Sequence, residues 1–237
     1  MKPSILFFFP TFCDGEKILS LTREARGILK RYADRFKILI IDDGSPDATS
    51  AIADEITRTF KEVQVIHHPR QQGYGSALCT GLTAREGFDY VFFTDGDHPV
   101  DLEYISLMIP RLADSDGVIT CRTNKPYGFY RRLISEGYNL IIHALFHLPF
   151  KDINSPLKAF RSEAVSGIEL HSSPFAPAEL LIKASGKGLK IAEVAIPSKP
   201  QQKGRSYAVR PLNILLTIRD MLILWWTMKT LKSAGPS

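Results

Sequence analysis

Short apolar runs alternate along the chain with longer stretches in which apolar residues recur every three or four positions. The short runs are rich in β-branched and aromatic residues, which is typical of buried parallel strands, and the longer stretches have the periodicity of helices. The predicted strands are Ile5–Phe9, Lys37–Ile41, Val63–His67, Tyr90–Thr94 and Val118–Cys121. The helices predicted between them are Ile18–Tyr32, Ala48–Phe60, Tyr74–Arg85 and Leu102–Leu112. This alternation predicts an α/β fold in which helices flank a mostly parallel sheet.

The alternation changes after residue 122. Helices are expected over Arg131–Phe146 and Ala178–Ser185, and a further strand over Lys190–Ile196. The segment Pro197–Arg210 is polar, basic and contains glycine, so we expect a mobile loop there. The expected organisation is one domain over residues 1–210, with halves at 1–121 and 122–210, followed by an amphipathic C-terminal helix over residues 211–237.

Two acidic clusters each follow a predicted strand. Asp42 and Asp43 come directly after the second strand, and Asp95 and Asp97 after the fourth. Each cluster taken alone is also a common turn sequence. However, open α/β sheets bind ligands at the carboxyl ends of their strands, where several carboxylates would repel one another without a cation. A divalent metal with a diphosphate fits this site, because hard cations prefer oxygen ligands and share them with phosphates.

The composition is ordinary for a globular protein, with 44% hydrophobic and 23% charged residues. Cys13, Cys79 and Cys121 are scattered, which argues against a disulfide framework or a zinc site and suits a reducing cytosol. The N-terminal apolar run is too short for a signal peptide. A net charge of +5 indicates an anionic partner. Without a basic stripe interleaved with aromatics, a nucleotide-sugar and an anionic membrane surface explain this charge better than nucleic acid does.

At the level of motifs the chain resembles family 2 glycosyltransferases with the GT-A (Rossmann-like) fold. Within them it is most similar to the dolichol-phosphate mannose synthase-like polyprenyl-phosphate sugar transferases. The resemblance covers about residues 3–211 and rests on Pro10–Glu16, Ile41–Asp47, Asp95–Asp97, Asp152–Arg161, Glu179–Leu181, Glu193–Pro197 and Lys203–Ser206, with a looser match at His68–Gly75. It implies that residues 1–121 bind the nucleotide-sugar and that residues 122–210 form the acceptor side.

The resemblance also implies a set of nucleotide-binding residues: Pro10, Phe12, Asp14, Asp42, Asp43, Gly73 and Asp95. Asp95 and Asp97 would bind Mg²⁺ or Mn²⁺ on the diphosphate, with Asp97 as a catalytic residue. Three positions depart from the family pattern, one of them Asp14, which stands where relatives carry Glu. Cys13 stands where relatives carry Asn, and Pro99 stands where they carry a Gln close to the metal. His98 is an alternative metal ligand or simply a solvated or packed residue.

On the acceptor side, the resemblance implies acceptor contacts by Arg131, Arg132, Ser155 and Glu179, and diphosphate contacts by Lys203, Arg205 and Ser206. Asp152 is a candidate catalytic residue with two possible roles. It would position the acceptor or the donor sugar if the acceptor is a lipid phosphate, because that group is already ionised near neutral pH. It would be the general base if the acceptor is a sugar hydroxyl. A structural turn or helix cap at Asp152 is the third interpretation.

The C-terminal segment Leu212–Met228 is long enough to span a bilayer, but Arg219 and Asp220 at its centre would be costly in hydrocarbon. The apolar run Met221–Trp226, followed by Lys229, suits a helix that lies at a membrane interface. Packing on the domain or on a second copy of the chain is the alternative, so a homo-oligomer and a membrane partner both remain open.

We therefore expect a metal-dependent, inverting glycosyltransferase that moves a sugar from a UDP- or GDP-sugar to an acceptor, with a polyprenyl phosphate favoured. It would work in the cytoplasm, peripherally at the cytoplasmic face of a membrane. A non-catalytic homologue that binds a nucleotide-sugar or a partner without turnover is the main alternative, because of Pro99. A phosphoacceptor signalling domain, which also carries acidic residues at strand ends, would lack the segments around Asp152 and Glu179.

Overall fold

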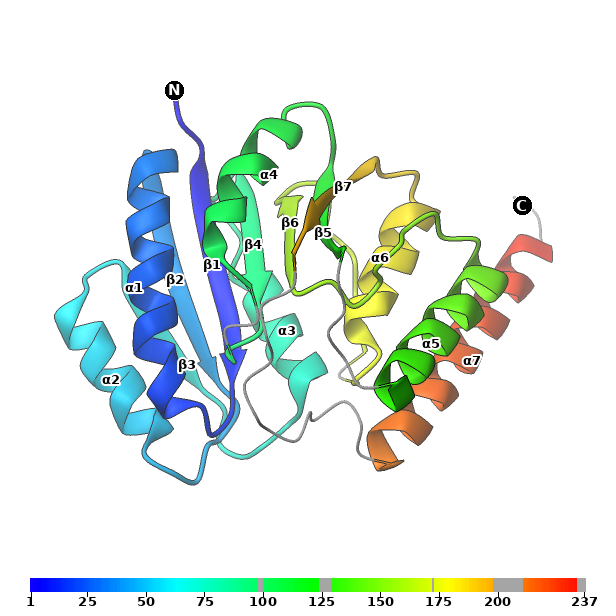
Figure 1. The fold of residues 1–237 in the computed structure, drawn as a ribbon, viewed down its shortest axis with the longest axis horizontal. Helices are drawn as coiled ribbons and strands as arrows, with labels where there is room; N and C mark the ends of the chain where they lie inside the picture. The colour runs from blue at the N-terminus through cyan, green and yellow to red at the C-terminus, as the bar shows by residue number, and fades with distance from the viewer. Residues whose placement is uncertain (98–99, 124–128, 172, 198–210, 234–237) are drawn as a thin grey trace.

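One sheet organises the chain, with the strand order β3-β2-β1-β4-β6-β5-β7 (Figure 1). The computed structural model describes residues 1–97, 100–123, 129–171, 173–197 and 211–233. The strands are β1 (Ser4–Thr11), β2 (Arg35–Asp42), β3 (Val63–His67), β4 (Tyr90–Thr94), β5 (Gly117–Arg122), β6 (Leu157–Arg161) and β7 (Ile191–Ile196). All pair in parallel except β6, which is antiparallel to both of its neighbours. The predicted α/β fold with a mostly parallel sheet is confirmed.

Helices cover both faces of this sheet because the strands are apolar on both sides. The helices are α1 (Gly15–Tyr32), α2 (Thr49–Thr59), α3 (Tyr74–Thr83), the 3₁₀ turn η1 (Leu102–Tyr104), α4 (Ile105–Arg111), α5 (Phe129–Phe146), α6 (Ala176–Gly186) and α7 (Pro211–Ser233). Successive side chains of β1 point to opposite faces. Phe7 packs in one hydrophobic cluster with α1, α2 and α4, whereas Phe8 packs in the other with α3, α5, α6 and α7.

The strand β6 has no counterpart among the predicted strands. Its sequence mixes apolar residues with Lys158 and Arg161, so it lacks the continuous apolar run of the other central strands. Because β6 is antiparallel, its first residue, Leu157, pairs with Thr94 at the carboxyl end of β4. The Thr94 hydroxyl also donates to the Pro156 carbonyl oxygen at 2.8 Å. The segment that begins at Asp152 and leads into β6 therefore lies at the same edge of the sheet as Asp95.

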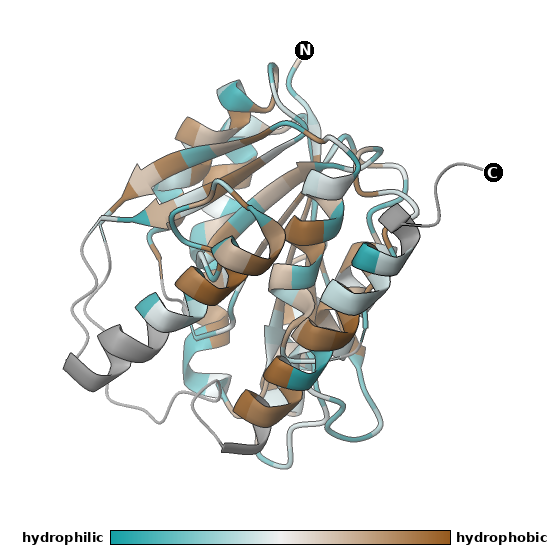
Figure 2. Ribbon diagram, turned by 90° about the vertical axis from the view of Figure 1, so that its right-hand side faces the viewer, coloured by the Kyte–Doolittle hydropathy of each residue, from teal (hydrophilic) through white to brown (hydrophobic). Residues whose placement is uncertain are grey.

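The C-terminal helix α7 lies on the same side of the molecule as α5 (Figures 1 and 2). Met221 and Leu224 are buried in the same cluster as α3 and α6, so the helix is part of the folded domain. Other large apolar side chains of α5 and α7 are exposed: Leu140, Ile141, Leu215, Ile218, Leu222, Ile223 and Trp226. Apolar residues thus lie on both the packed and the exposed sides of α7, and its amphipathic character is weaker than predicted. In the ranges given above, every helix is too short or too polar to cross a membrane.

Candidate active site

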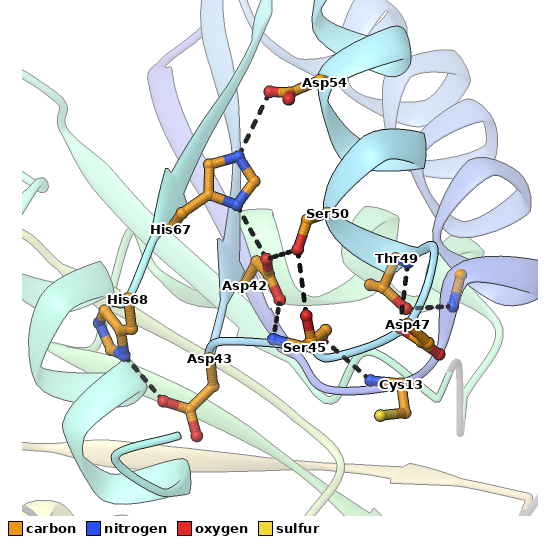
Figure 3. Close-up of polar contacts among 11 residues, drawn as sticks. Cys13, Asp42, Asp43, Ser45, Asp47, Thr49, Ser50, Asp54, His67 and His68 are labelled. Carbon is orange, nitrogen blue, oxygen red and sulfur yellow. Dashed lines mark hydrogen bonds and ion pairs between the residues drawn. The ribbon is translucent and has the colours of Figure 1, made fainter. Parts of the chain in front are cut away.

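Asp42 ends β2 and is buried, with its carboxylate held by three protein groups (Figure 3). The Ser45 backbone N–H donates to Oδ1 at 3.1 Å, the Ser50 hydroxyl donates to Oδ2 at 2.5 Å, and His67 Nδ1 lies 2.8 Å from Oδ2. Burial by itself raises the pKa of Asp42, but these hydrogen bonds outweigh it and lower the pKa below its ordinary value. Asp42 therefore stays ionised and ties the loop after β2 to α2 and β3.

Asp43, the next residue, holds the segment before α3 in place through hydrogen bonds. The backbone N–H groups of Gln72 and Gly73 donate to its carboxylate at 2.9 and 2.8 Å. His68 Nδ1 lies 2.8 Å from Asp43 Oδ1, and His68 Nε2 lies 3.0 Å from the hydroxyl oxygen of Thr80 on α3. Asp43 thus fixes the segment that leads into α3, and the predicted nucleotide-binding residue Gly73 is one of its partners.

The sequence analysis did not identify His67 or His68 as partners of the aspartates, although the pairing of the two predicted strands could have indicated them. In the parallel register His67 lies opposite Asp42 at the ends of β3 and β2. Consecutive side chains point to opposite sides, so His67 meets Asp42 and Asp54 of α2, whereas His68 meets Asp43 and α3. Both aspartates are held in place by protein groups, and their contact with a nucleotide stays a prediction.

The end of β1 meets the Asp-Gly-Asp turn that follows β4. A β-carbon placed on Gly96 would lie only 2.4 Å from the carbonyl oxygen of Pro10, so only glycine fits between the two aspartates. At the start of α1, the carboxylate of Asp14 pairs with Lys17 at 3.0 Å. The first predicted nucleotide-binding segment therefore lies beside the predicted metal-binding turn. The individual roles of Pro10, Phe12 and Asp14 stay predictions.

Asp95 is partly buried at the end of β4, and Asp97 is exposed two residues later. The pKa of Asp95 is raised, because its carboxyl group is shielded from water. A hydrogen bond shared with the Tyr74 hydroxyl and the positive charges of Lys158 and Arg122 act in the opposite direction. Burial raises the pKa of Tyr74 well above its ordinary value, and the negative charges of Asp95 and Asp97 raise it further.

A divalent cation fits these two carboxylates if other oxygens complete its coordination. Over the ranges that the structure covers, no three His, Cys, Asp or Glu side chains come together as a metal site. Asp95 and Asp97 would therefore supply a minority of the ligands, and phosphate and water oxygens the rest, as hard cations permit. His98 and Pro99 lie outside the described residues, so their predicted effects on the metal stay untested.

Asp152 is buried and bound by Arg122, the last residue of β5. The Arg122 guanidinium donates to Asp152 Oδ2 from Nε at 2.6 Å and to Oδ1 from Nη2 at 2.9 Å, and it also donates to the carbonyl oxygen of Asn154 at 2.9 Å. A bidentate guanidinium stabilises the ionised carboxylate, which makes Asp152 a poor proton acceptor. This geometry suits a positioning role or a structural one, and the role of Asp152 stays a prediction.

Lys158 of β6 is buried and interacts electrostatically with the carboxylates of Asp95 and Asp152. The sequence analysis did not identify it as a candidate site residue. Burial lowers its pKa to about 8, while the charges of Asp95 and Asp152 act to raise it. Its ammonium donates to the carbonyl oxygen of Ser155 at 2.5 Å. The Ser155 hydroxyl is buried without a hydrogen-bond partner in the described part of the chain. Arg122 and Lys158 thus supply cationic charge beside Asp95 and Asp152.

The remaining predicted acceptor residues are less well placed or lie outside the described residues. Glu179 is buried on α6, where its carboxylate forms an ion pair with Lys183 Nζ at 2.7 Å and accepts from the His171 backbone N–H at 3.0 Å. Glu179 therefore anchors the segment before α6, and its contact with an acceptor stays a prediction. Arg131 and Arg132 belong to α5, with side chains outside the described set. The loop residues Lys203, Arg205 and Ser206, with the predicted mobility of their loop, also lie outside it.

Comparison with known proteins gives a consistent family assignment. The sequence profile of Glycosyl transferase family 2 matches residues 16–166. The chain is 31% identical over 221 residues to dolichol-phosphate mannosyltransferase from Pyrococcus furiosus, which covers 87% of this chain. It is 26% identical over 214 residues to polyprenol monophosphomannose synthase from Mycolicibacterium smegmatis, which covers 85% of this chain. The chain spans 59% of the length of the first relative and 79% of the second.

A solved structure shows the same fold at lower identity. Glucosyl-3-phosphoglycerate synthase from Mycobacterium tuberculosis, crystallised with Mn²⁺, UDP and glucosyl-3-phosphoglycerate, superposes with a TM-score of 0.69 and 21% sequence identity. The match covers 90% of this chain and 75% of that enzyme. It supports the fold of the whole domain, including the part that follows residue 166.

Proposed function

Since the chain belongs to glycosyl transferase family 2, we propose that it transfers a sugar from a UDP- or GDP-sugar to a polyprenyl phosphate. The observation that carries this proposal is the convergence of three groups at the carboxyl edge of one sheet. They are the loop of Asp42 and Asp43, the Asp95–Asp97 turn, and the Arg122–Asp152 pair delivered by β5 and β6. Two relatives are named dolichol-phosphate mannosyltransferase and polyprenol monophosphomannose synthase, and these names favour a polyprenyl phosphate as the acceptor class.

In this proposal Asp95 and Asp97 hold Mg²⁺ or Mn²⁺ against the diphosphate. Such a cation, when bound, offsets the charge that develops on the leaving diphosphate. Asp42 and Asp43 present the loop that receives the nucleotide, and Arg205, with Lys203 and Ser206, closes over the diphosphate from the loop after β7. Closure of that loop would exclude water and favour transfer over hydrolysis.

If the acceptor is a lipid phosphate, the reaction needs little help from a general base. A phosphate monoester is ionised near neutral pH, so it can attack the anomeric carbon directly and invert its configuration. The buried pair of Arg122 and Asp152 agrees with this mechanism, because a carboxylate held by a guanidinium is suited to orienting groups and not to removing a proton. Arg131 and Arg132 of α5 are proposed to meet the acceptor phosphate.

A lipid acceptor also requires contact with a membrane. The exposed apolar side chains of α5 and α7 are the surface proposed for peripheral contact, at the cytoplasmic face where nucleotide-sugars are available. Lys229 lies on α7 near these side chains and would suit anionic headgroups.

The test is a screen of donors against one acceptor. Purified protein is incubated with radiolabelled UDP- or GDP-sugars, Mn²⁺ and polyprenyl phosphate in vesicles, and labelled lipid is extracted. The proposal expects labelled lipid from at least one donor and none when polyprenyl phosphate is left out. Binding of a nucleoside diphosphate without transfer to this acceptor and without donor hydrolysis would instead indicate a non-catalytic nucleotide-sugar binder.

A further inference from the structure

His68 directly follows β3, and its side chain faces the loop after β2 that the proposed function assigns to the nucleotide (Figure 3). Its backbone N–H donates to the carbonyl oxygen of Asp42 at 2.8 Å, which extends the pairing of β3 with β2. The residue is buried, and both of its ring nitrogens meet polar groups. A buried histidine that is bonded at both nitrogens has the orientation of its ring fixed by the fold.

The two contacts of the His68 ring have a defined polarity. Nδ1 lies 2.8 Å from Asp43 Oδ1, and a carboxylate can only accept, so Nδ1 carries a hydrogen. Nε2 lies 3.0 Å from the hydroxyl oxygen of Thr80 on α3. That hydroxyl can donate to Nε2, or it can donate to the Ser76 carbonyl oxygen at 3.1 Å and accept from Nε2. In both arrangements Thr80 holds one side of the ring, and Nδ1 points at Asp43.

This contact decides which oxygen of Asp43 can accept a further hydrogen bond. Over the described residues, Oδ1 accepts from His68 Nδ1 and from the Gln72 backbone N–H at 2.9 Å, whereas Oδ2 accepts from the Gly73 backbone N–H at 2.8 Å. Each carboxylate oxygen has two lone pairs, so Oδ1 is filled and Oδ2 can accept once more. Without His68, each oxygen would have one donor and the two would be equivalent.

The backbone around Asp43 is fixed as well, so its donors control the carboxylate. The Asp43 N–H donates to the carbonyl oxygen of Thr11 at 3.0 Å. The next residue, Gly44, has a φ of 69°, and a β-carbon there would lie 2.5 Å from the carbonyl carbon of Arg70. The loop is therefore held between β1 and the segment after β3, and Asp43 cannot move as a whole to meet a ligand.

We propose that His68 is a positioning residue for nucleotide binding. It fills Oδ1 of Asp43 and thereby reserves Oδ2 for a hydrogen-bond donor of the nucleoside, which is a ring N–H of the base or the 2′-hydroxyl of the ribose. Thr80 supports this role by holding the far side of the ring. The inference rests on the proposed function, because it takes Asp43 as a nucleotide contact.

Two substitutions of His68 separate the two contacts of its ring. The amide nitrogen of Asn is as many bonds from the β-carbon as Nδ1 is, so His68→Asn keeps a donor for Asp43 and loses the contact with Thr80. The amide nitrogen of Gln corresponds in the same way to Nε2, so His68→Gln keeps the contact with Thr80 and loses the donor for Asp43. Each variant is the matched control for the other. Affinity for UDP and GDP without metal is measured by titration calorimetry, and the melting temperature on the same samples.

We expect His68→Gln to bind the preferred nucleotide roughly tenfold more weakly than the parent, as when one hydrogen bond to a charged group is removed. His68→Asn should bind it almost as tightly as the parent, although both variants lower the melting temperature. The loss in His68→Gln should vanish in a protein that already carries Asp43→Asn, because His68 acts through Asp43. The 2′-deoxynucleotide identifies the donor: it keeps the difference between the variants if the base donates and abolishes it if the 2′-hydroxyl does.

Equal losses in His68→Gln and His68→Asn would make His68 a structural support of α3, and tight binding by His68→Gln would remove it from the site. Either result overturns the positioning role and leaves the proposed function intact. Nuclear magnetic resonance of the histidine ring nitrogens in the parent gives a test that depends on no variant's folding. It should show a hydrogen on Nδ1 of His68 whose signal shifts when nucleotide is added, and an Nδ1 without hydrogen would overturn the role. Failure of the parent to bind either nucleotide would overturn the role and the proposed function together.

Discussion

At the residue scale, Cys13 adopts a backbone conformation that suits the Asn of the family pattern better than it suits cysteine. Its φ is 57°, in the left-handed region that a β-carbon disfavours. Asparagine tolerates this region better than other residues with side chains, and the resembling family carries Asn at this position. The residue is exposed overall, but partial shielding of its thiol from water, followed by the charges of Asp47, Asp14 and Asp42, raises the thiol pKa, so it is not an activated nucleophile.

Replacing Cys13 by Asn should therefore stabilise the protein. The expected gain in the free energy of unfolding is about 0.5–1 kcal/mol, a part of the cost of the left-handed conformation. Urea unfolding followed by circular dichroism measures it. Cys13→Ala lacks the short polar side chain through which Asn tolerates this conformation and should bring no gain, so equal stabilisation by both variants would contradict this account.

A second residue-scale prediction concerns the pair of His67 and Asp42. Partial burial lowers the pKa of His67, but hydrogen bonds to Asp42 and Asp54 and the charges of these aspartates outweigh it, so the pKa in the folded state is raised. The stabilisation from this pair is thus fully present below the pKa of unfolded histidine, near 6.5, and is lost as the pH rises through the raised value.

His67→Gln should therefore cost more stability at pH 5.5 than at pH 9. The difference should be below about 1 kcal/mol, because the His67 side chain is 36% exposed and solvent screens the pair. Urea unfolding of both proteins at the two pH values gives this quantity. The same cost at both pH values would mean that the charge of His67 contributes nothing to the fold.

At the scale of elements, the sequence predicted the parallel part of the sheet and missed its reversal. Strands such as β1 and β4 are buried on both faces and read as continuous apolar runs. Strand β6 contains Lys158 and Arg161, which interrupt its apolar run, and Arg161 binds the carbonyl oxygen of Leu112 from a distant part of the sequence. Arg122, His67 and His68 were missed for a similar reason. Each of them binds an aspartate that lies at least 25 residues away in the sequence.

The contact of α3 with β1 supports a prediction at this scale. A β-carbon at Gly81 would lie 2.2 Å from the ring of Phe8, which is fully buried and stacked on Phe93. Gly81→Ala should therefore destabilise the protein by about 1–3 kcal/mol through overpacking, despite the better helix propensity of alanine.

Gly27→Ala on α1 is the matched control for this substitution. Nothing lies within 4 Å of the added β-carbon there, so stability should rise by up to about 1 kcal/mol. Thermal unfolding of the two variants distinguishes the effects. A gain in stability at Gly81 would show that α3 does not pack on β1 as closely as described.

At the scale of the whole molecule, α5 and α7 lie on one side of the fold (Figure 2), and both carry exposed apolar side chains. Leu222→Ser combined with Trp226→Ser should reduce binding to vesicles that contain anionic lipid by roughly tenfold or more, because two large apolar groups no longer enter the interface. Co-sedimentation with vesicles measures this. Full binding by the double variant would remove α7 from the proposed membrane contact.

The acidic turn after β4 carries the central claim, that the carboxyl edge of the sheet is a metal-assisted sugar-transfer site. The most direct test is transfer of labelled sugar to polyprenyl phosphate by Asp97→Asn, with the parent in Mn²⁺ and in EDTA as references. Asp97 is exposed, so the substitution should leave the melting temperature unchanged. It should lower transfer at least about a hundredfold, since a neutral amide is a weaker ligand for a hard cation. Undiminished transfer by this variant, or by the parent in EDTA, would contradict the account.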